Sequence, residues 1–131
     1  MQEHEVRELL ERLYQAMDPA LEYQARHEDF TVEMPQSGER TDREGLRTLQ
    51  EHFPGGPPEV TLRRVTGNGN LWFVETEIHY ADGKVFLGAK IVEFRDGKIL
   101  RETRYYGEPF EAPAWRAQWV QRIEEPVASG A

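Results

Sequence analysis

The sequence predicts a single α+β domain in which N-terminal helices precede a curved, largely antiparallel sheet. Apolar residues recur at helical spacing at the start of the chain, whereas from Glu59 onward they alternate with the period of a β-strand. Two Asp-Gly pairs, Asp82-Gly83 and Asp96-Gly97, separate runs rich in Val, Ile, Thr and aromatic residues. Such pairs are typical of tight hairpin turns. Helices followed by consecutive antiparallel strands indicate an α+β architecture.

Three helices are expected in the N-terminal half, over residues 2–17, 19–26 and 42–52. In the first helix, apolar residues form one face and Glu and Arg separate them. Pro19 occupies the first position of the second helix, with Asp18 as its N-cap. Either Thr41 or Asp42 caps the third helix, and Thr41 with Glu44 matches a capping box.

Five strands are expected, over residues 27–33, 60–66, 71–80, 84–95 and 98–106. Side chains alternate across a strand, so each turn decides which residues share a face. A two-residue turn at Asp82-Gly83 pairs Glu75 with Lys90. Because a strongly twisted sheet curls, we expect the helices to close its concave side and to leave a cone with a cavity.

The last strand leaves two alternatives open. A strict two-residue turn at Asp96-Gly97 places Arg101, Thr103 and Tyr105 on the face of Lys90. A bulge after the turn instead places Glu102, Arg104 and Tyr106 on that face.

The composition describes a polar chain with one domain. Its 131 residues, of which 38% are hydrophobic and 31% charged, are enough for one core. We expect this domain over residues 1–125 and a flexible tail over residues 126–131. No run approaches the roughly 18 apolar residues of a membrane span, and the acidic, helical N-terminus is unlike a signal peptide. We therefore expect a cytoplasmic protein without a membrane partner.

Charge and residue usage exclude several classes of site. A net charge of −8 argues against nucleic acid as a partner, because phosphate binding needs a basic face. The chain has no cysteine, and its two serines, Ser37 and Ser129, lie in a loop and in the tail, which argues against a serine triad. No metal-ligand spacing relates the histidines, which are His4, His27, His52 and His79. We expect neither a metal nor another cofactor.

Several segments resemble one family of cone-shaped domains. They are Leu13-Tyr14, the run from Phe30 to Pro35, the helix start Asp42-Arg-Glu-Gly45, the run from Phe94 to Ile99, and Arg104-Tyr-Tyr106. With these segments the chain resembles the NTF2-like superfamily, which includes nuclear transport factor 2, ketosteroid isomerase, limonene epoxide hydrolase and the SnoaL-like polyketide cyclases. The resemblance spans roughly residues 5–106 and specifies the fold better than the activity.

The resemblance transfers functional residues only in part. Met34 stands where ketosteroid isomerases have their Asp base, so Glu33 would have to replace that base. Tyr14 matches the tyrosine that donates to the oxyanion in those enzymes. The last-strand Asp of limonene epoxide hydrolases falls on Arg104, and the Arg and Asp of their third strand fall on Glu75 and Glu77. The resemblance to the cyclases makes Glu102 the nearest candidate for a cavity carboxylate.

Together these arguments predict a candidate site on the concave face of the sheet. Glu102 or Glu77 would exchange a proton with a small apolar molecule, and Arg104 would stabilise developing oxyanion charge. The remaining cavity-lining residues expected are Tyr14, Glu33, Glu75, His79, Phe86, Lys90 and Tyr106. The alternative is a noncatalytic small-molecule-binding or dimerisation domain, in which the charged residues form cross-strand ion pairs on the sheet surface.

The face opposite the cavity is expected to pair with a second copy, because antiparallel sheets with two apolar faces seldom stay bare. The predicted partners are therefore a small apolar molecule and a homodimer formed through the sheet. Trp115 and Trp119 lie four residues apart on a short expected helix, and would cover either the cavity mouth or the dimer partner.

Overall fold

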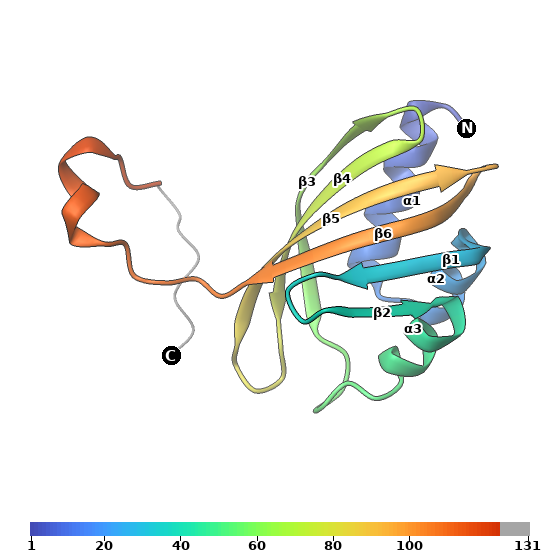
Figure 1. Ribbon diagram of the computed structural model, residues 1–131, viewed down its shortest axis with the longest axis horizontal. Coiled ribbons are helices and arrows are strands. Elements are labelled where there is room, and N and C mark those ends of the chain that lie inside the picture. The colour runs from blue at the N-terminus through green and yellow to red at the C-terminus, as the bar shows by residue number, and fades with distance from the viewer. Residues whose placement is uncertain (124–131) are drawn as a thin grey trace.

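The computed structural model describes residues 1–123, and it consists of a curved sheet with helices on its concave side (Figure 1). The helices are α1 (Glu3–Ala16), α2 (Pro19–Ala25) and α3 (Arg43–Gln50). Helix α1 packs against one edge strand, β3, and α2 and α3 pack near the other edge, against β1. The helices thereby close the concave side and leave the opposite face of the sheet uncovered.

The sheet is mixed rather than purely antiparallel. Its strands are β1 (Arg26–Met34), β2 (Glu39–Asp42), β3 (Glu59–Asn68), β4 (Leu71–His79), β5 (Val85–Arg95) and β6 (Lys98–Gly107). They lie in the order β2-β1-β6-β5-β4-β3. Strand β1 pairs with β6 in parallel, and all other neighbours are antiparallel. The predicted α+β cone is confirmed. Strand β2 was not expected, because its four polar residues carry no apolar alternation.

Two aspartates cap the N-termini of α2 and α3, as the sequence predicts. The Asp18 carboxylate accepts hydrogen bonds from two backbone N–H groups in the first turn of α2, and Pro19 follows it. Asp42, rather than Thr41, is the N-cap of α3, since its Oδ1 accepts a hydrogen bond of 2.8 Å from the Gly45 N–H. These caps fix where α2 and α3 begin.

The β4–β5 hairpin differs from the sequence prediction by one residue. The loop has three residues, Ala81 to Gly83, and is closed by a hydrogen bond of 2.9 Å from the Tyr80 N–H to the Lys84 carbonyl. Gly83 has a φ of 89°, a left-handed conformation that glycine adopts without strain. Lys90 therefore pairs with Val74, not with Glu75 as predicted.

A one-residue shift moves every side chain of β4 to the other face of the sheet. The concave face of β4 consequently carries Trp72, Val74, Thr76 and Ile78, all buried. The prediction that Glu75, Glu77 and His79 share the face of Lys90 is wrong.

The β5–β6 hairpin has the bulge that the second alternative required. Lys90 pairs with Arg104 and Val92 pairs with Glu102, and the register shifts nearer the turn, between Glu93 and Phe94. The extra residue turns Glu102, Arg104 and Tyr106 toward the concave face.

After β6 the chain leaves the body of the domain as an extended arm, which carries the 3-10 helix η1 (Ala114–Trp119) (Figure 1). Trp115 and Trp119 are each 73% exposed, and neither lines the cavity described below. No helix in the described part of the chain is both long and apolar enough to cross a membrane. The flexible tail expected over residues 126–131 lies outside the described residues.

Candidate functional site

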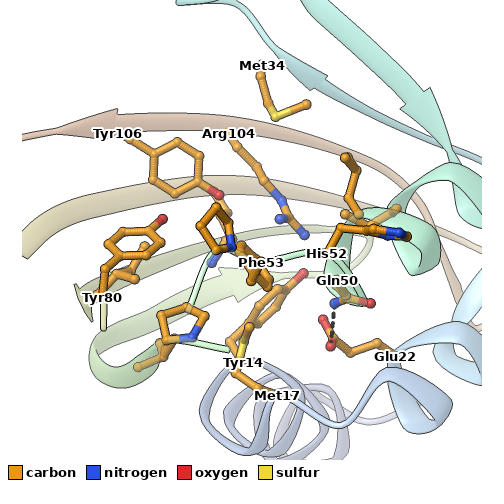
Figure 2. A pocket seen from close by; sticks show the side chains of 17 residues that line it. Tyr14, Met17, Glu22, Met34, Gln50, His52, Phe53, Tyr80, Arg104 and Tyr106 are labelled. Carbon is orange, nitrogen blue, oxygen red and sulfur yellow. Dashed lines mark hydrogen bonds between the residues drawn. The ribbon is translucent and has the colours of Figure 1, made fainter. Parts of the chain in front are cut away.

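A cavity of about 310 Å³ opens on the concave side of the sheet, between α1, the α3 region and strands β3 to β6. Most of its wall is apolar or aromatic, and Figure 2 shows these side chains around it. The lining residues are Tyr14, Met17, Glu22, Met34, Leu46, Leu49, Gln50, His52, Phe53, Pro54, Pro58, Val60, Ile78, Tyr80, Lys90, Arg104 and Tyr106. Its size is at the lower end of the range for small-molecule sites.

Polar groups gather where α1 approaches β5 and β6. Lys90 and Arg104 are paired on neighbouring strands. The Lys90 Nζ lies 4.7 Å from the centre of the Tyr14 ring, in cation–π contact. The Tyr14 hydroxyl is buried near the Glu102 carboxylate, but no group in the described structure meets it in hydrogen-bond geometry. Together with Tyr106, these three side chains place hydrogen-bond donors on a cavity wall that is mostly apolar or aromatic.

Glu102 lies on the same face, beneath this cluster, and is 0% exposed. Its Oε2 accepts a hydrogen bond of 3.0 Å from Arg26 Nε, and its Oε1 accepts one of 2.9 Å from Arg104 Nη2. Burial alone would raise the pKa of Glu102, but the Arg104 and Arg26 charges outweigh it and lower the pKa to about 2. Glu102 is therefore a fixed carboxylate at neutral pH that orients two arginines.

A second buried carboxylate continues this network toward the cavity. Glu22, on α2, accepts a hydrogen bond of 3.1 Å from Arg26 Nη2. It accepts a second one, of 2.7 Å, from Gln50 Nε2, which Figure 2 shows. Both of its oxygens are thus engaged. The chain of contacts runs from the end of α3 through α2 and β1 to β6, so it holds the helices against the sheet beside the cavity.

Lys90 differs from the other buried charges because its amine has no carboxylate partner and contacts the Tyr14 ring instead. The side chain is 6% exposed. No carboxylate in the described structure lies within ion-pair distance of its Nζ, although four buried charged groups nearby, Glu22, Arg26, Glu102 and Arg104, are paired. Burial, and after it the positive charge of Arg104, lower the pKa of Lys90 to about 7. A substantial fraction of this amine is therefore neutral near pH 7.

The structure brings five of the predicted site residues together on the concave face: Tyr14, Lys90, Glu102, Arg104 and Tyr106. All but Glu102 line the cavity directly. Phe86 shares this face, but it packs against the edge of the Tyr80 ring at a centroid distance of 5.4 Å and does not line the cavity.

Four predicted residues lie elsewhere. Glu75 pairs with Arg64, Glu77 with His79, and Glu33 with Arg40, at 2.5, 3.0 and 2.7 Å. Glu33 was expected to approach the cavity, but Met34, its neighbour on β1, lines the cavity instead. Gly88, on β5, is closely packed, because a Cβ there would lie 2.5 Å from the Thr76 Oγ1.

Sequence reasoning missed Glu22 and Arg26, which are both 2% exposed. Their spacing of four residues is a signal for an ion pair, but the same spacing is common on exposed helix faces. It also missed most of the cavity wall that follows α3, which includes His52, Phe53, Pro54 and Pro58. This segment has no apolar periodicity that would mark it as part of a wall.

The described residues contain no group of three or more His, Asp or Glu side chains that could hold a metal ion. The cavity wall carries the Lys90 amine, the Arg104 guanidinium group and the phenolic hydroxyls of Tyr14, Tyr80 and Tyr106. It also carries the Glu22 carboxylate, the Gln50 amide and the His52 imidazole. The amine, guanidinium and hydroxyl groups can donate hydrogen bonds to an oxygen atom of a bound molecule, and the Lys90 amine can also accept a proton.

Comparisons with known proteins agree with this architecture. A model of the SnoaL-like domain family matches residues 6–102. The structure of an NTF-2 like protein of unknown function from Burkholderia xenovorans LB400 superposes with a TM-score of 0.83 and 42% identity, covering 94% of this chain and 98% of that one. No curated protein matches the chain.

Two more distant structures share the fold. A protein from Kribbella flavida DSM 17836, provisionally described as a ketosteroid isomerase, has a TM-score of 0.79 and 23% identity over 95% of this chain and 93% of its own. An NTF2-like protein of unknown function from Mesorhizobium loti has a TM-score of 0.67 and 22% identity over 79% of this chain and 89% of its own. The concave sheet, the cavity and the family match lead to one conclusion: the chain belongs to the SnoaL-like domain family and has the NTF2-like fold.

Proposed function

We propose that the cone binds a small, largely apolar molecule that carries an oxygen function, and that the protein performs cofactor-independent acid–base chemistry on it. The observation that carries this proposal is the buried, unpartnered Tyr14 hydroxyl on the wall of a mostly apolar cavity. Buried hydroxyl groups are normally hydrogen-bonded, and an oxygen atom of the ligand would supply the missing partner. The apolar wall would bury the rest of the molecule.

Lys90 supports the acid–base part of the proposal better than the carboxylates do. A general base acts best when its pKa is near the working pH. Glu102 is held as an anion by two arginines, and Glu77 lies on the outer face, so neither is suited to proton exchange in the cavity. The Lys90 amine would accept the proton, and Arg104 with Tyr14 would donate hydrogen bonds to the oxygen that gains charge.

A binding experiment tests the first part of the proposal. We expect 2-naphthylmethanol, an apolar alcohol, to shift backbone NMR signals of cavity residues such as Ile78 and Tyr80, but not those of Phe73 on the outer face. The variant Val60→Trp would fill the cavity and weaken binding at least tenfold. The matched variant Thr61→Trp, on the exposed side of β3, should bind normally. Shifts confined to the outer face would refute a ligand site in the cone.

A deuterium-exchange experiment tests whether the Lys90 amine acts as a base toward a bound molecule. We expect the protein to speed exchange of the methyl hydrogens of 2-acetylnaphthalene in D₂O. The rate should rise as the pH passes about 7 and then level off, because the neutral Lys90 amine is the base. Lys90→Met should abolish the acceleration while retaining binding of 2-naphthylmethanol.

The noncatalytic alternative also has a specific observation in its favour. Both buried carboxylates, Glu22 and Glu102, are fully engaged by Arg26, Arg104 or Gln50. If 2-naphthylmethanol binds and no ketone exchanges hydrogen, the domain is a small-molecule-binding module.

We also propose that a second copy of the chain covers the outer face of the sheet. Apolar side chains on this face are unusually exposed: Leu71, Phe73, Leu87 and Tyr105 have exposed fractions of 46, 43, 37 and 42%. Large apolar side chains exposed on one face of a sheet are typical of a protein interface.

A further inference from the structure

The Lys90 amine is a buried nucleophile that belongs to no ion pair in the described structure, and it lies at the cavity wall. Arg26, Arg104, Glu22 and Glu102 all take part in hydrogen-bonded pairs. The Lys90 amine takes part in none within the described structure, yet its side chain lines the cavity wall. A lysine held by a carboxylate is a poor nucleophile, because the attraction favours the protonated form.

The surroundings of Lys90 favour the neutral amine from several directions. Arg104 on β6 adds positive charge beside it, and Arg26 on β1 adds more from farther away, while Glu102 and Glu22 act in the opposite sense. The attraction between the Lys90 ammonium and these two carboxylates does not offset burial and the repulsion from the two arginines. A desolvated lysine next to another cationic group is a recognised arrangement for an activated amine.

We propose that Lys90 attacks the carbonyl carbon of an aldehyde or ketone held in the cone and forms an imine with it. The proposal rests on the proposed function, because the cavity must first bind the carbonyl compound. It adds the class of ligand, a small apolar carbonyl compound, and a covalent step.

Imine formation needs no reactant other than the amine and the carbonyl compound. A C–N bond forms between Lys90 Nζ and the carbonyl carbon as the C=O π bond breaks. The two amine hydrogens transfer to the oxygen, the C–O bond breaks, water leaves, and a C=N bond remains. Tyr14 is placed to donate a hydrogen bond to the carbonyl oxygen, since its hydroxyl is free and its ring contacts Lys90 Nζ.

The sequence offers internal controls, because it contains only three lysines. Lys84 is exposed in the β4–β5 loop. Lys98, also exposed, donates a hydrogen bond of 2.6 Å to the Gln24 carbonyl. A solvated lysine amine is almost fully protonated at pH 7. Reductive trapping at that pH should therefore distinguish Lys90 from both other lysines.

The experiment treats the full chain with 2-naphthaldehyde and sodium cyanoborohydride at pH 7, followed by digestion and peptide mass spectrometry. The hydride converts an imine into a stable secondary amine, so the modified residue can be identified. We expect modification of Lys90 to exceed that of Lys84 and Lys98 at least tenfold. The Lys84→Met variant should be modified like the parent, Lys90→Met should lose the adduct, and unfolding in urea should remove the selectivity.

Binding of 2-naphthylmethanol, which cannot form an imine, separates the possible failures. If this alcohol binds in the cavity but Lys90 gains no adduct, or gains no more than Lys84 and Lys98, the imine proposal is wrong and the binding function stands. If the alcohol does not bind, the proposed function fails and the imine proposal fails with it. The peptide map of the parent protein shows whether Lys90 is modified in preference to Lys84 and Lys98, even if Lys90→Met does not fold.

Discussion

Lys90 and Glu102 show how one patch of sheet gives two buried groups opposite roles. They lie on adjacent strands and share Arg104 as a neighbour. Arg104 donates hydrogen bonds to Glu102 and stabilises its charge, whereas the same guanidinium group repels the Lys90 ammonium. The result is a permanent anion and an amine that gains or loses its proton near pH 7.

The Lys90 pKa predicts how stability depends on pH. Because the folded pKa of about 7 lies below the ordinary value of 10.5, the unfolded state binds more protons between these values. Stability should rise from about pH 7 toward pH 10. Lys90→Met should remove this rise and should be more stable than the parent at pH 6, by up to about 3–5 kcal/mol. Urea unfolding at several pH values tests this, and an unchanged slope for Lys90→Met would contradict it.

Removing the Glu102 charge should destabilise the protein. Glu102→Gln leaves Arg104 and part of Arg26 without a counter-charge in a buried environment, for which we expect a loss of about 3–5 kcal/mol in the free energy of unfolding. The matched control, Glu75→Gln, breaks an exposed pair with Arg64 and should cost less than about 1 kcal/mol.

Acid unfolding checks the same carboxylate independently. Glu102 has a folded pKa of about 2, below the ordinary value of 4.5, so the unfolded state takes up its proton first as the pH falls. The stabilisation from Glu102 should be complete above pH 4.5 and should disappear toward pH 2. Glu102→Gln should flatten that part of the stability curve, and an equally steep curve for the variant would show that other groups cause it.

At the scale of elements, the two hairpins show which features of the fold the sequence predicts and which it does not. Element types and order follow from periodicity, caps and the Asp-Gly turns, and the structure agrees with them for three helices and five strands. Loop length is less readable, because Asp-Gly also fits a three-residue loop whose last residue is glycine. The error of one residue in the β4–β5 loop reversed the faces of β4, and three of the predicted site residues moved with it.

The β5–β6 hairpin had the opposite outcome, since the bulged alternative correctly grouped Glu102, Arg104 and Tyr106. The partners of these residues could not be predicted. Arg26 reaches Glu102 from 76 positions earlier in the chain, through a parallel pairing of β1 with β6 that no turn signal marks.

Gly88 tests the packing between β4, β5 and β6. A methyl group added there would lie 2.5 Å from the Thr76 Oγ1 and 3.4 Å from the Tyr106 ring. Gly88→Ala should therefore cost about 1–3 kcal/mol of stability and weaken binding of 2-naphthylmethanol by displacing Tyr106. Gly107→Ala is the control, because nothing lies within 4 Å of its added methyl. Equal stability of the two variants would refute the tight contact.

At the scale of the whole molecule, the helices cover only the concave side of the sheet (Figure 1). A dimer through the outer face would bury the exposed apolar side chains there without closing the cavity. We expect light scattering to give the mass of a homodimer, and Phe73→Glu to give a monomer. Arg12→Glu, on the exposed side of α1, should leave the dimer intact. A monomeric parent protein at micromolar concentration would contradict the proposal.

The most direct test of the account is an NMR titration of the lysine side chains in protein labelled with ¹³C-lysine. With three lysines in the chain, Lys90→Met assigns the Lys90 signal. We expect the Lys90 signal to titrate near pH 7 and to shift when 2-naphthylmethanol is added. A Lys90 signal that titrates at the ordinary lysine value of about 10.4 and ignores the alcohol would contradict this expectation.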